Sequence, residues 1–127
     1  MASQKEIAIS LLATGTIALD AAAADTLYTV PTGKTCILDK LMIVASADMG
    51  ATTLTVGRST ALTDFLPTQT MTACNGAGSV ARLAPVPNAT TVEHFEYAAG
   101  VIIQANVTAG NGDATNTFYL YGTLDDA

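Results

Sequence analysis

Charged residues are scarce in this chain. Asp, Glu, Lys and Arg make up only 13% of its 127 residues, against about a quarter in ordinary soluble domains. Eleven acidic residues outnumber five basic ones, so the formal net charge is −6. Nucleic acids and anionic membranes bind clustered positive charge, and the five basic residues are scattered along the chain. We therefore expect neither a nucleic acid nor a membrane as a partner.

Cysteine and histidine offer little material for a metal or redox site. Cys36 and Cys74 lie far apart, with no CxxC motif and no His at ligand spacing, so we expect two buried free thiols rather than zinc ligands or a disulfide. His94 belongs to the only cluster of titratable groups, with Glu93 and Glu96. In a strand, His94 and Glu96 would share one face and Glu93 would lie on the other. We interpret the cluster as an exposed ion-paired patch rather than a metal or acid–base site.

The sequence patterns that catalysis requires are also missing. No Ser sits in a nucleophile elbow, and no glycine-rich run follows a strand and opens a helix, as phosphate binding requires. The Asp residues are too dispersed for a calcium-binding loop. We expect no catalytic residues, no metal and no cofactor, and so a protein that is not an enzyme.

No apolar run is long enough to cross a bilayer. The most apolar N-terminal segment, residues 7–24, is interrupted by Ser, Thr and Gly. The basic region before it is a lone Lys5 beside Glu6. We expect neither a transmembrane helix nor a signal peptide.

Alternating apolar and polar residues predict β-strands over much of the chain. Residues 101–108 and 117–124 alternate most regularly. Residues 110–113, between them, are Gly, Asn, Gly and Asp, which tolerate positive φ and favour tight turns. We expect the two strands to form a β-hairpin.

Further strands and turns are expected upstream. The strands cover residues 27–30, 35–45 and 52–57, and turns lie at residues 31–34 and 47–50. From Ser59 to Pro87 the pattern is least regular, and we expect Pro67, Pro85 and Pro87 to interrupt any strand there and residues 75–78 to form a loop. Several short strands separated by turns predict an all-β sandwich or barrel.

The N-terminus has two possible structures. Ser3 and Glu6 fit a helix capping box, and Gly15 is placed to end such a helix. A strand would instead bring three apolar side chains to one face: Ile7, Ile9 and Leu11. We expect residues 1–13 to form an N-terminal arm and residues 14–127 to form the folded domain.

The uncharged polar residues point towards contact with other subunits. Ala and Thr make up about a third of the chain, and a Thr-rich face suits packing against a subunit, although Thr also favours the solvent face of any sheet. Tyr119 and Tyr121 share one face of the last strand. Such a pair can stack on a sugar and more often fills an interface.

Two segments resemble a known family. LYTVPTGKTCILDKLMI, residues 27–43, resembles the opening of small β-sandwich proteins on the virions of tailed bacteriophages, in which a LYTVPxGK turn leads into a long apolar strand. YAAGVIIQANVTAGNGDATNTFYLYGTL, residues 97–124, is similar to the closing strands of the same proteins. The likeness covers most of residues 14–124.

The resemblance implies a jelly-roll-like β-sandwich, most often a trimeric decoration or cement protein on the capsid. It implies no catalytic residues. We therefore expect an all-β, single antiparallel sandwich that assembles in the host cytoplasm onto the major capsid protein at the virion surface. A tail or fibre component that binds a receptor or glycan is the alternative. The residues expected to contact partners are Ile7, Ile9, Leu11, Tyr119 and Tyr121.

Overall fold

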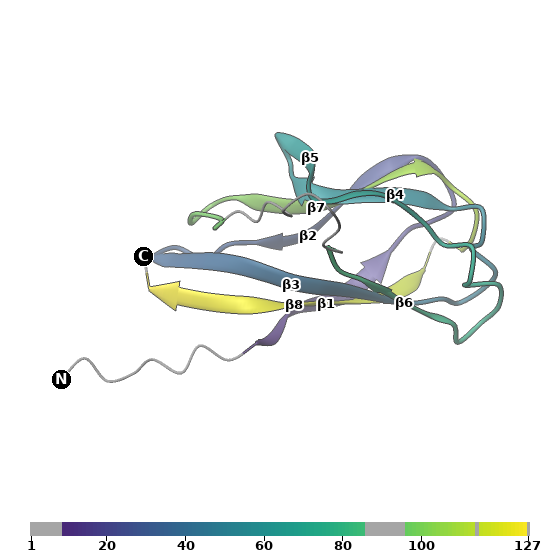
Figure 1. The fold of residues 1–127 in the computed structure, drawn as a ribbon, viewed down its shortest axis with the longest axis horizontal. Coiled ribbons are helices and arrows are strands. Elements are labelled where there is room, and N and C mark those ends of the chain that lie inside the picture. The colour runs from purple at the N-terminus through teal and green to yellow at the C-terminus, as the bar shows by residue number, and fades with distance from the viewer. Residues whose placement is uncertain (1–8, 86–95, 114, 127) are drawn as a thin grey trace, which may run out of the picture.

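Eight β-strands form the regular structure. The computed structural model describes residues 9–85, 96–113 and 115–126, and within these ranges there is no helix. The strands are β1 (Ser10–Ile17), β2 (Ala23–Thr29), β3 (Lys34–Val44), β4 (Thr53–Arg58), β5 (Ala61–Thr70), β6 (Val80–Leu83), β7 (Ile102–Ala109) and β8 (Asn116–Asp126). They lie in two layers (Figure 1).

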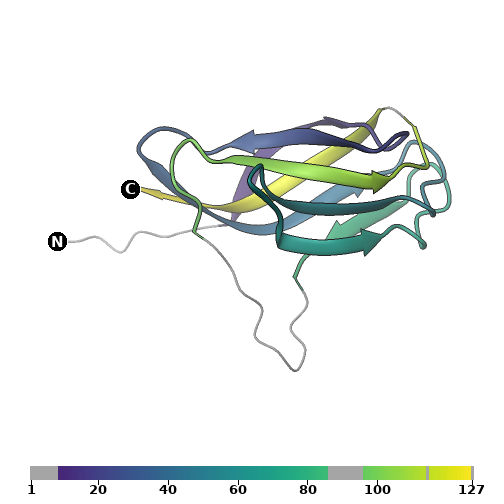
Figure 2. The same ribbon diagram turned by 90° about the horizontal axis from the view of Figure 1, so that it is seen from above.

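The strand order is that of a jelly roll. One sheet has the order β1-β8-β3-β6 and the other β2-β7-β4-β5, with every pair antiparallel. Among successive strands only β4 and β5 are neighbours in one sheet; every other connection crosses from one sheet to the other. This crossing pattern distinguishes a jelly roll from a meander. The expected antiparallel sandwich of jelly-roll type is confirmed, and Figure 2 shows the β2-β7-β4-β5 sheet from above.

The helix considered for the N-terminus is wrong from Ser10 onward. Ser10–Ile17 form β1, which pairs with β8. The Thr14 hydroxyl donates a hydrogen bond to the Phe118 carbonyl (2.9 Å), and the Phe118 ring packs so close to Gly15 that an added Cβ would lie 3.1 Å from it. Pairing with a distant strand therefore overrides the local helix signal. The capping residues Ser3 and Glu6 lie outside the described residues.

The expected hairpin of residues 101–124 is also wrong, because β7 and β8 belong to different sheets. Asn116 fixes the crossing: its Oδ1 accepts a hydrogen bond from the Ser46 N–H (3.0 Å), and its Nδ2 donates to the carbonyls of Ile17 (3.2 Å) and Asp113 (2.8 Å). Gly110 lies against the backbone of Ala21 with no room for a Cβ. Residues 110–113 do form a turn, but its direction is set by these long-range contacts.

The middle of the chain contains more strand than expected. Pro67 lies within β5 instead of interrupting it. The strand is at the edge of its sheet, where no neighbour needs the N–H that proline lacks. The partners of Leu54 and Val56 on β5 are Gln69 and Leu66, so a bulge at Pro67 absorbs one extra residue.

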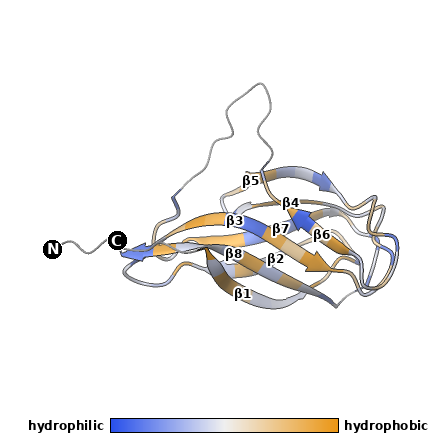
Figure 3. Ribbon diagram, turned by 60° about the horizontal axis from the view of Figure 1, so that its bottom comes forward, coloured by the Kyte–Doolittle hydropathy of each residue, from blue (hydrophilic) through white to orange (hydrophobic). Residues whose placement is uncertain are grey.

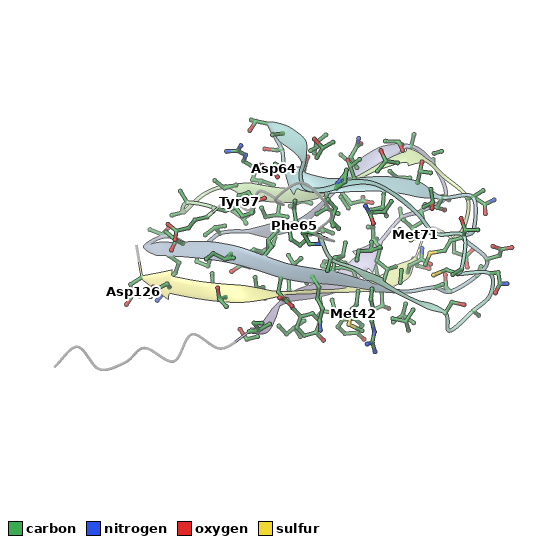
Figure 4. The ribbon with its side chains drawn as sticks, in the orientation of Figure 1. Met42, Asp64, Phe65, Met71, Tyr97 and Asp126 are labelled. Atoms are coloured by element: carbon green, nitrogen blue, oxygen red, sulfur yellow. The ribbon has the colours of Figure 1, made fainter. Side chains whose placement is uncertain are left out.

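The core fills the space between the sheets. Phe65 points into this space in Figure 4 and is 5% exposed. The largest fully buried side chains come from both sheets and their loops: Ile17, Leu19, Leu41, Ile43, Met49, Leu54, Leu66, Met71, Ile103 and Leu120. Cys36 and Cys74 are both free and buried, as predicted.

Candidate partner-binding surface

Strand β8 presents Tyr119 and Tyr121 on the outside of the sandwich. Phe118 and Leu120, which alternate with them, are buried in the core. Each tyrosine is therefore held by a strand whose other face is anchored in the core. This placement follows directly from the alternation in the sequence.

The pairing of β1 with β8 brings the two predicted contact groups together. Leu11 lies opposite Tyr121 in the register. Leu11 is 48% exposed and Ile9 is 58% exposed. Ile7 lies outside the described residues. Residues 110 positions apart in sequence thus form one surface.

Strand β3 extends this surface on the other side of β8. Met42 lies opposite Tyr119 and Lys40 opposite Tyr121. The Lys40 ammonium is 5.0 Å from the centre of the Tyr121 ring, which is a cation–π contact. Figure 4 shows Met42 pointing away from the core.

Strand β6 completes the surface. Arg82 lies opposite Met42, and Val80 lies opposite Val44. Figure 3 shows this sheet with its outside turned forward; on β3 a hydrophilic segment separates two hydrophobic stretches. We call the whole surface the apolar face, and it comprises Ile9, Leu11, Ile37, Lys40, Met42, Val44, Val80, Arg82, Tyr119 and Tyr121.

The β3 and β6 residues of the apolar face were not predicted. The clue was in residues 36–45, where the run is apolar at nearly every position and not only at alternate ones. A strand in a two-layer sandwich has one outer face, so an apolar run on both faces indicates that the outer face is also covered by something.

The opposite outer face, on the β2-β7-β4-β5 sheet, has a different character. Gln104 donates a hydrogen bond to the Thr26 hydroxyl (3.3 Å), and the hydroxyls of Thr53 and Thr108 lie 2.6 Å apart. Of the six exposed large hydrophobic residues in the described chain, four belong to the apolar face: Ile9, Leu11, Ile37 and Val80. Apolar exposure is therefore concentrated on one side of the sandwich.

One cluster of ionisable groups lies away from this face. The Asp64 carboxylate accepts hydrogen bonds from Arg58 Nε (2.6 Å) and from the Tyr97 hydroxyl (2.9 Å). Burial, and then the neighbouring Asp64, raise the pKa of Tyr97. The backbone of Tyr97 also exchanges hydrogen bonds with Cys36 of β3 (2.9 and 2.8 Å). The cluster therefore ties β5 of one sheet to β3 of the other.

Most of the predicted Glu93/His94/Glu96 patch cannot be placed, because Glu93 and His94 lie outside the described residues. Glu96 is exposed. Across the described ranges, no three His, Cys, Asp or Glu side chains are grouped so that they could hold a metal ion. The same ranges contain no helix long and apolar enough to cross a membrane.

Comparison with known proteins identifies a structural relative but no family. No family model and no curated protein matches the sequence. The structure matches a chain of the cyanophage Pam1 capsid asymmetric unit with a TM-score of 0.56. The two chains share a fold. Their sequences are 16% identical, and the match covers 98% of this chain and 89% of that one, so two whole chains of similar length are alike.

Proposed function

We propose that this protein is a structural component of a phage virion, a decoration or cement protein that binds the major capsid protein and stabilises the head lattice. The observation that carries this proposal is the whole-length structural likeness to a chain of a phage capsid asymmetric unit. The apolar face supports it, because a continuous exposed apolar surface on a small protein marks an interaction site.

The stabilisation follows from linkage. A protein that binds only the intact lattice stabilises it by about 2.7 kcal/mol per site at a hundredfold excess over Kd. Many such sites on one shell act together. A domain with no chemistry of its own can thus raise the temperature at which a shell ruptures.

The test uses empty heads assembled without this protein. Purified protein should bind these heads saturably and raise their rupture temperature, followed by light scattering or by release of a dye that reports shell opening. If it neither binds nor delays rupture, the cement function is wrong. Saturable binding on a glycan array at the Tyr119/Tyr121 surface, without binding to heads, would instead support the tail or fibre alternative.

We further propose that the protein is a homotrimer on the virion. Strand β1 lies at a sheet edge, and Ser10–Ile17 contain no charged residue and no proline. Edge strands without such residues tend to pair with another chain. The other three edges are better protected: β2 contains Asp25, β5 contains Asp64 and Pro67, and β6 has only four residues. Subunit contacts at β1 would cover the unprotected edge.

The N-terminal arm is proposed as a second contact with the head. Because β1 begins at Ser10, deleting residues 1–13 would also remove part of a strand. Deleting residues 1–8 leaves β1 complete and removes Ile7. The truncated protein should keep the melting temperature of the full chain and bind heads more weakly; equal head binding would show that the arm makes no contact.

A further inference from the structure

We propose that the apolar face binds a region of the capsid protein that is apolar at its centre and presents carboxylates to Lys40 and Arg82. This inference rests on the proposed function and names the chemistry of the partner surface. Its basis is the distribution of the few positive charges over an acidic protein.

The described chain has four cationic side chains, and they fall into two pairs. Lys34 is ion-paired with Asp126 (2.6 Å) and Arg58 with Asp64 (2.6 Å). Lys40 and Arg82 lie on the apolar face, Lys40 two residues before Met42 on β3 and Arg82 opposite Met42 on β6. No ion pair joins either of them to a carboxylate in the part of the chain that the structure describes. Among the described residues of this chain of net charge −6, the two cations without an ion-paired carboxylate thus both lie on the most apolar surface.

This placement limits what can cover the face. Burying a cation without an acceptor costs free energy, so a partner that covers Lys40 and Arg82 must supply carboxylates or other acceptors. A second copy docked face to face would bring two Lys40 and two Arg82 side chains into one interface, and such like-charge contacts are unfavourable. The charges therefore favour a different protein surface over a second copy.

The rest of the face has the composition of an interface centre. Tyr119 and Tyr121 of β8 lie between β1, with the exposed Leu11, and β3, with Lys40 and Met42. Arg82 of β6 lies opposite Met42. Aromatic residues, Met and Arg are enriched at interface centres, where a few of them contribute most of the binding free energy. The Lys40 ammonium lies over the Tyr121 ring. This cation–π contact restricts the position of the charge on the surface.

The experiment compares two double variants with the same net charge. Lys40→Gln with Arg82→Gln removes both cations from the apolar face. Thr26→Glu with Thr108→Glu changes the net charge by the same amount on the opposite outer face, where both threonines are exposed. Each variant is checked by its melting temperature and then tested for binding to empty heads by sedimentation.

We expect the Lys40/Arg82 variant to bind heads at least roughly tenfold more weakly, as the loss of two charge pairs at an interface implies, and the Thr26/Thr108 variant to bind like the unmodified protein. Binding of the unmodified protein should weaken as ionic strength rises from about 0.03 M to about 0.3 M, and the Lys40/Arg82 variant should lose most of this dependence.

The outcomes separate this inference from the proposed function. If the unmodified protein binds heads and the Lys40/Arg82 variant binds equally well, the assignment of the face is wrong and the cement function stands. If the Lys40/Arg82 variant changes the oligomer mass but not head binding, the face is a subunit interface and the inference is overturned. If the unmodified protein binds a single-stranded oligonucleotide and no heads, both the inference and the cement function are wrong.

Discussion

At the scale of single residues, the Tyr97 hydroxyl belongs to a residue that is 2% exposed. It donates a hydrogen bond to Asp64, whose side chain is 6% exposed, and it connects the two sheets. Tyr97→Phe should lower the free energy of unfolding by about 1–2 kcal/mol, because a buried carboxylate loses a hydrogen-bond donor. Urea denaturation measures the change.

The matched control is Tyr28→Phe. Tyr28 is partly buried against the core, and its hydroxyl makes no hydrogen bond within the described residues. Removing the Tyr28 hydroxyl should change the free energy of unfolding by less than about 0.5 kcal/mol. Equal effects of the two substitutions would show that the Tyr97–Asp64 bond contributes nothing beyond packing.

Cys36 should make the free energy of unfolding decrease as the pH rises into the alkaline range. Burial raises the pKa of its thiol from 9.0 to about 11, so above pH 9 the unfolded chain releases a proton that the folded chain keeps. The contribution of Cys36 to the free energy of unfolding should therefore be constant below about pH 8 and should fall between pH 9 and 11 by on the order of 2 kcal/mol. The raised pKa of Tyr97 adds to the fall from pH 10 upward.

The measurement is denaturant unfolding at a series of pH values, for the unmodified protein and for Cys36→Ala. The variant is less stable at every pH because a buried side chain has been shortened. Its stability should nevertheless fall less between pH 9 and 10, because the Cys36 thiol is absent. The pKa of Cys74 is also raised by burial, and its contribution is the same in both proteins. An unchanged slope in that interval would mean that Cys36 is not the group responsible.

At the scale of elements, the crossing from β7 to β8 depends on Gly110. A Cβ at this position would overlap the backbone of Ala21, and backbone cannot move aside as the end of a side chain can. Gly110→Ala should lower the free energy of unfolding by more than about 2 kcal/mol, a loss typical of substitutions that force extra atoms into a packed site. Gly76→Ala is the control, since nothing lies within 4 Å of the added Cβ.

Gly76→Ala should leave the free energy of unfolding unchanged or raise it by up to about 1 kcal/mol, because alanine restricts the unfolded chain more than glycine does. The denaturant midpoints of Gly110→Ala and Gly76→Ala, each compared with that of the unmodified protein, measure the two effects. If Gly110→Ala is tolerated as well as Gly76→Ala, the close approach of residues 20–21 to the β7–β8 connection is not a constraint on the fold.

At the scale of the whole molecule, the proposed trimer is directly testable. The chain mass is 12.9 kDa, so light scattering should give 3 × 12.9 = 38.7 kDa. Thr16→Lys places a charge on the exposed edge strand β1 and should shift the mass towards that of a monomer. Thr26→Lys, on the edge strand β2 of the other sheet, should leave the mass unchanged.

A mass of 12.9 kDa for the unmodified protein at all micromolar concentrations would contradict the trimer. A trimer that survives Thr16→Lys but not Thr26→Lys would move the subunit contact from β1 to β2. The Lys40/Arg82 variant of the head-binding test lies in β3 and β6, whereas its control includes Thr26 of β2. The control is therefore valid only if the mass of the oligomer is unchanged by substitution at Thr26.

Local sequence patterns were sufficient to predict several strands and the outward position of Tyr119 and Tyr121 on the apolar face. The alternation in residues 117–124 predicted which side of β8 is buried, and Tyr119 and Tyr121 lie outside as that alternation requires. The turn at residues 31–34 was also predicted from its residues: Gly33 adopts φ +78°, and the Lys34 N–H bonds to the Pro31 carbonyl (3.2 Å). Alternation and turn chemistry act over a few residues, so the sequence shows them directly.

Partner strands were decided only by the tertiary structure. Whether the turn at residues 110–113 folds back as a hairpin or crosses to the other sheet depends on Asn116, Ser46 and Ile17, which no local pattern connects. The contact of Leu11 with the Tyr121 region, and the gathering of Lys40, Arg82 and Met42 on one face, depend on strand register. Register is a cooperative property of strands far apart in the chain, because one shift of a single residue would turn a strand's whole core face outward.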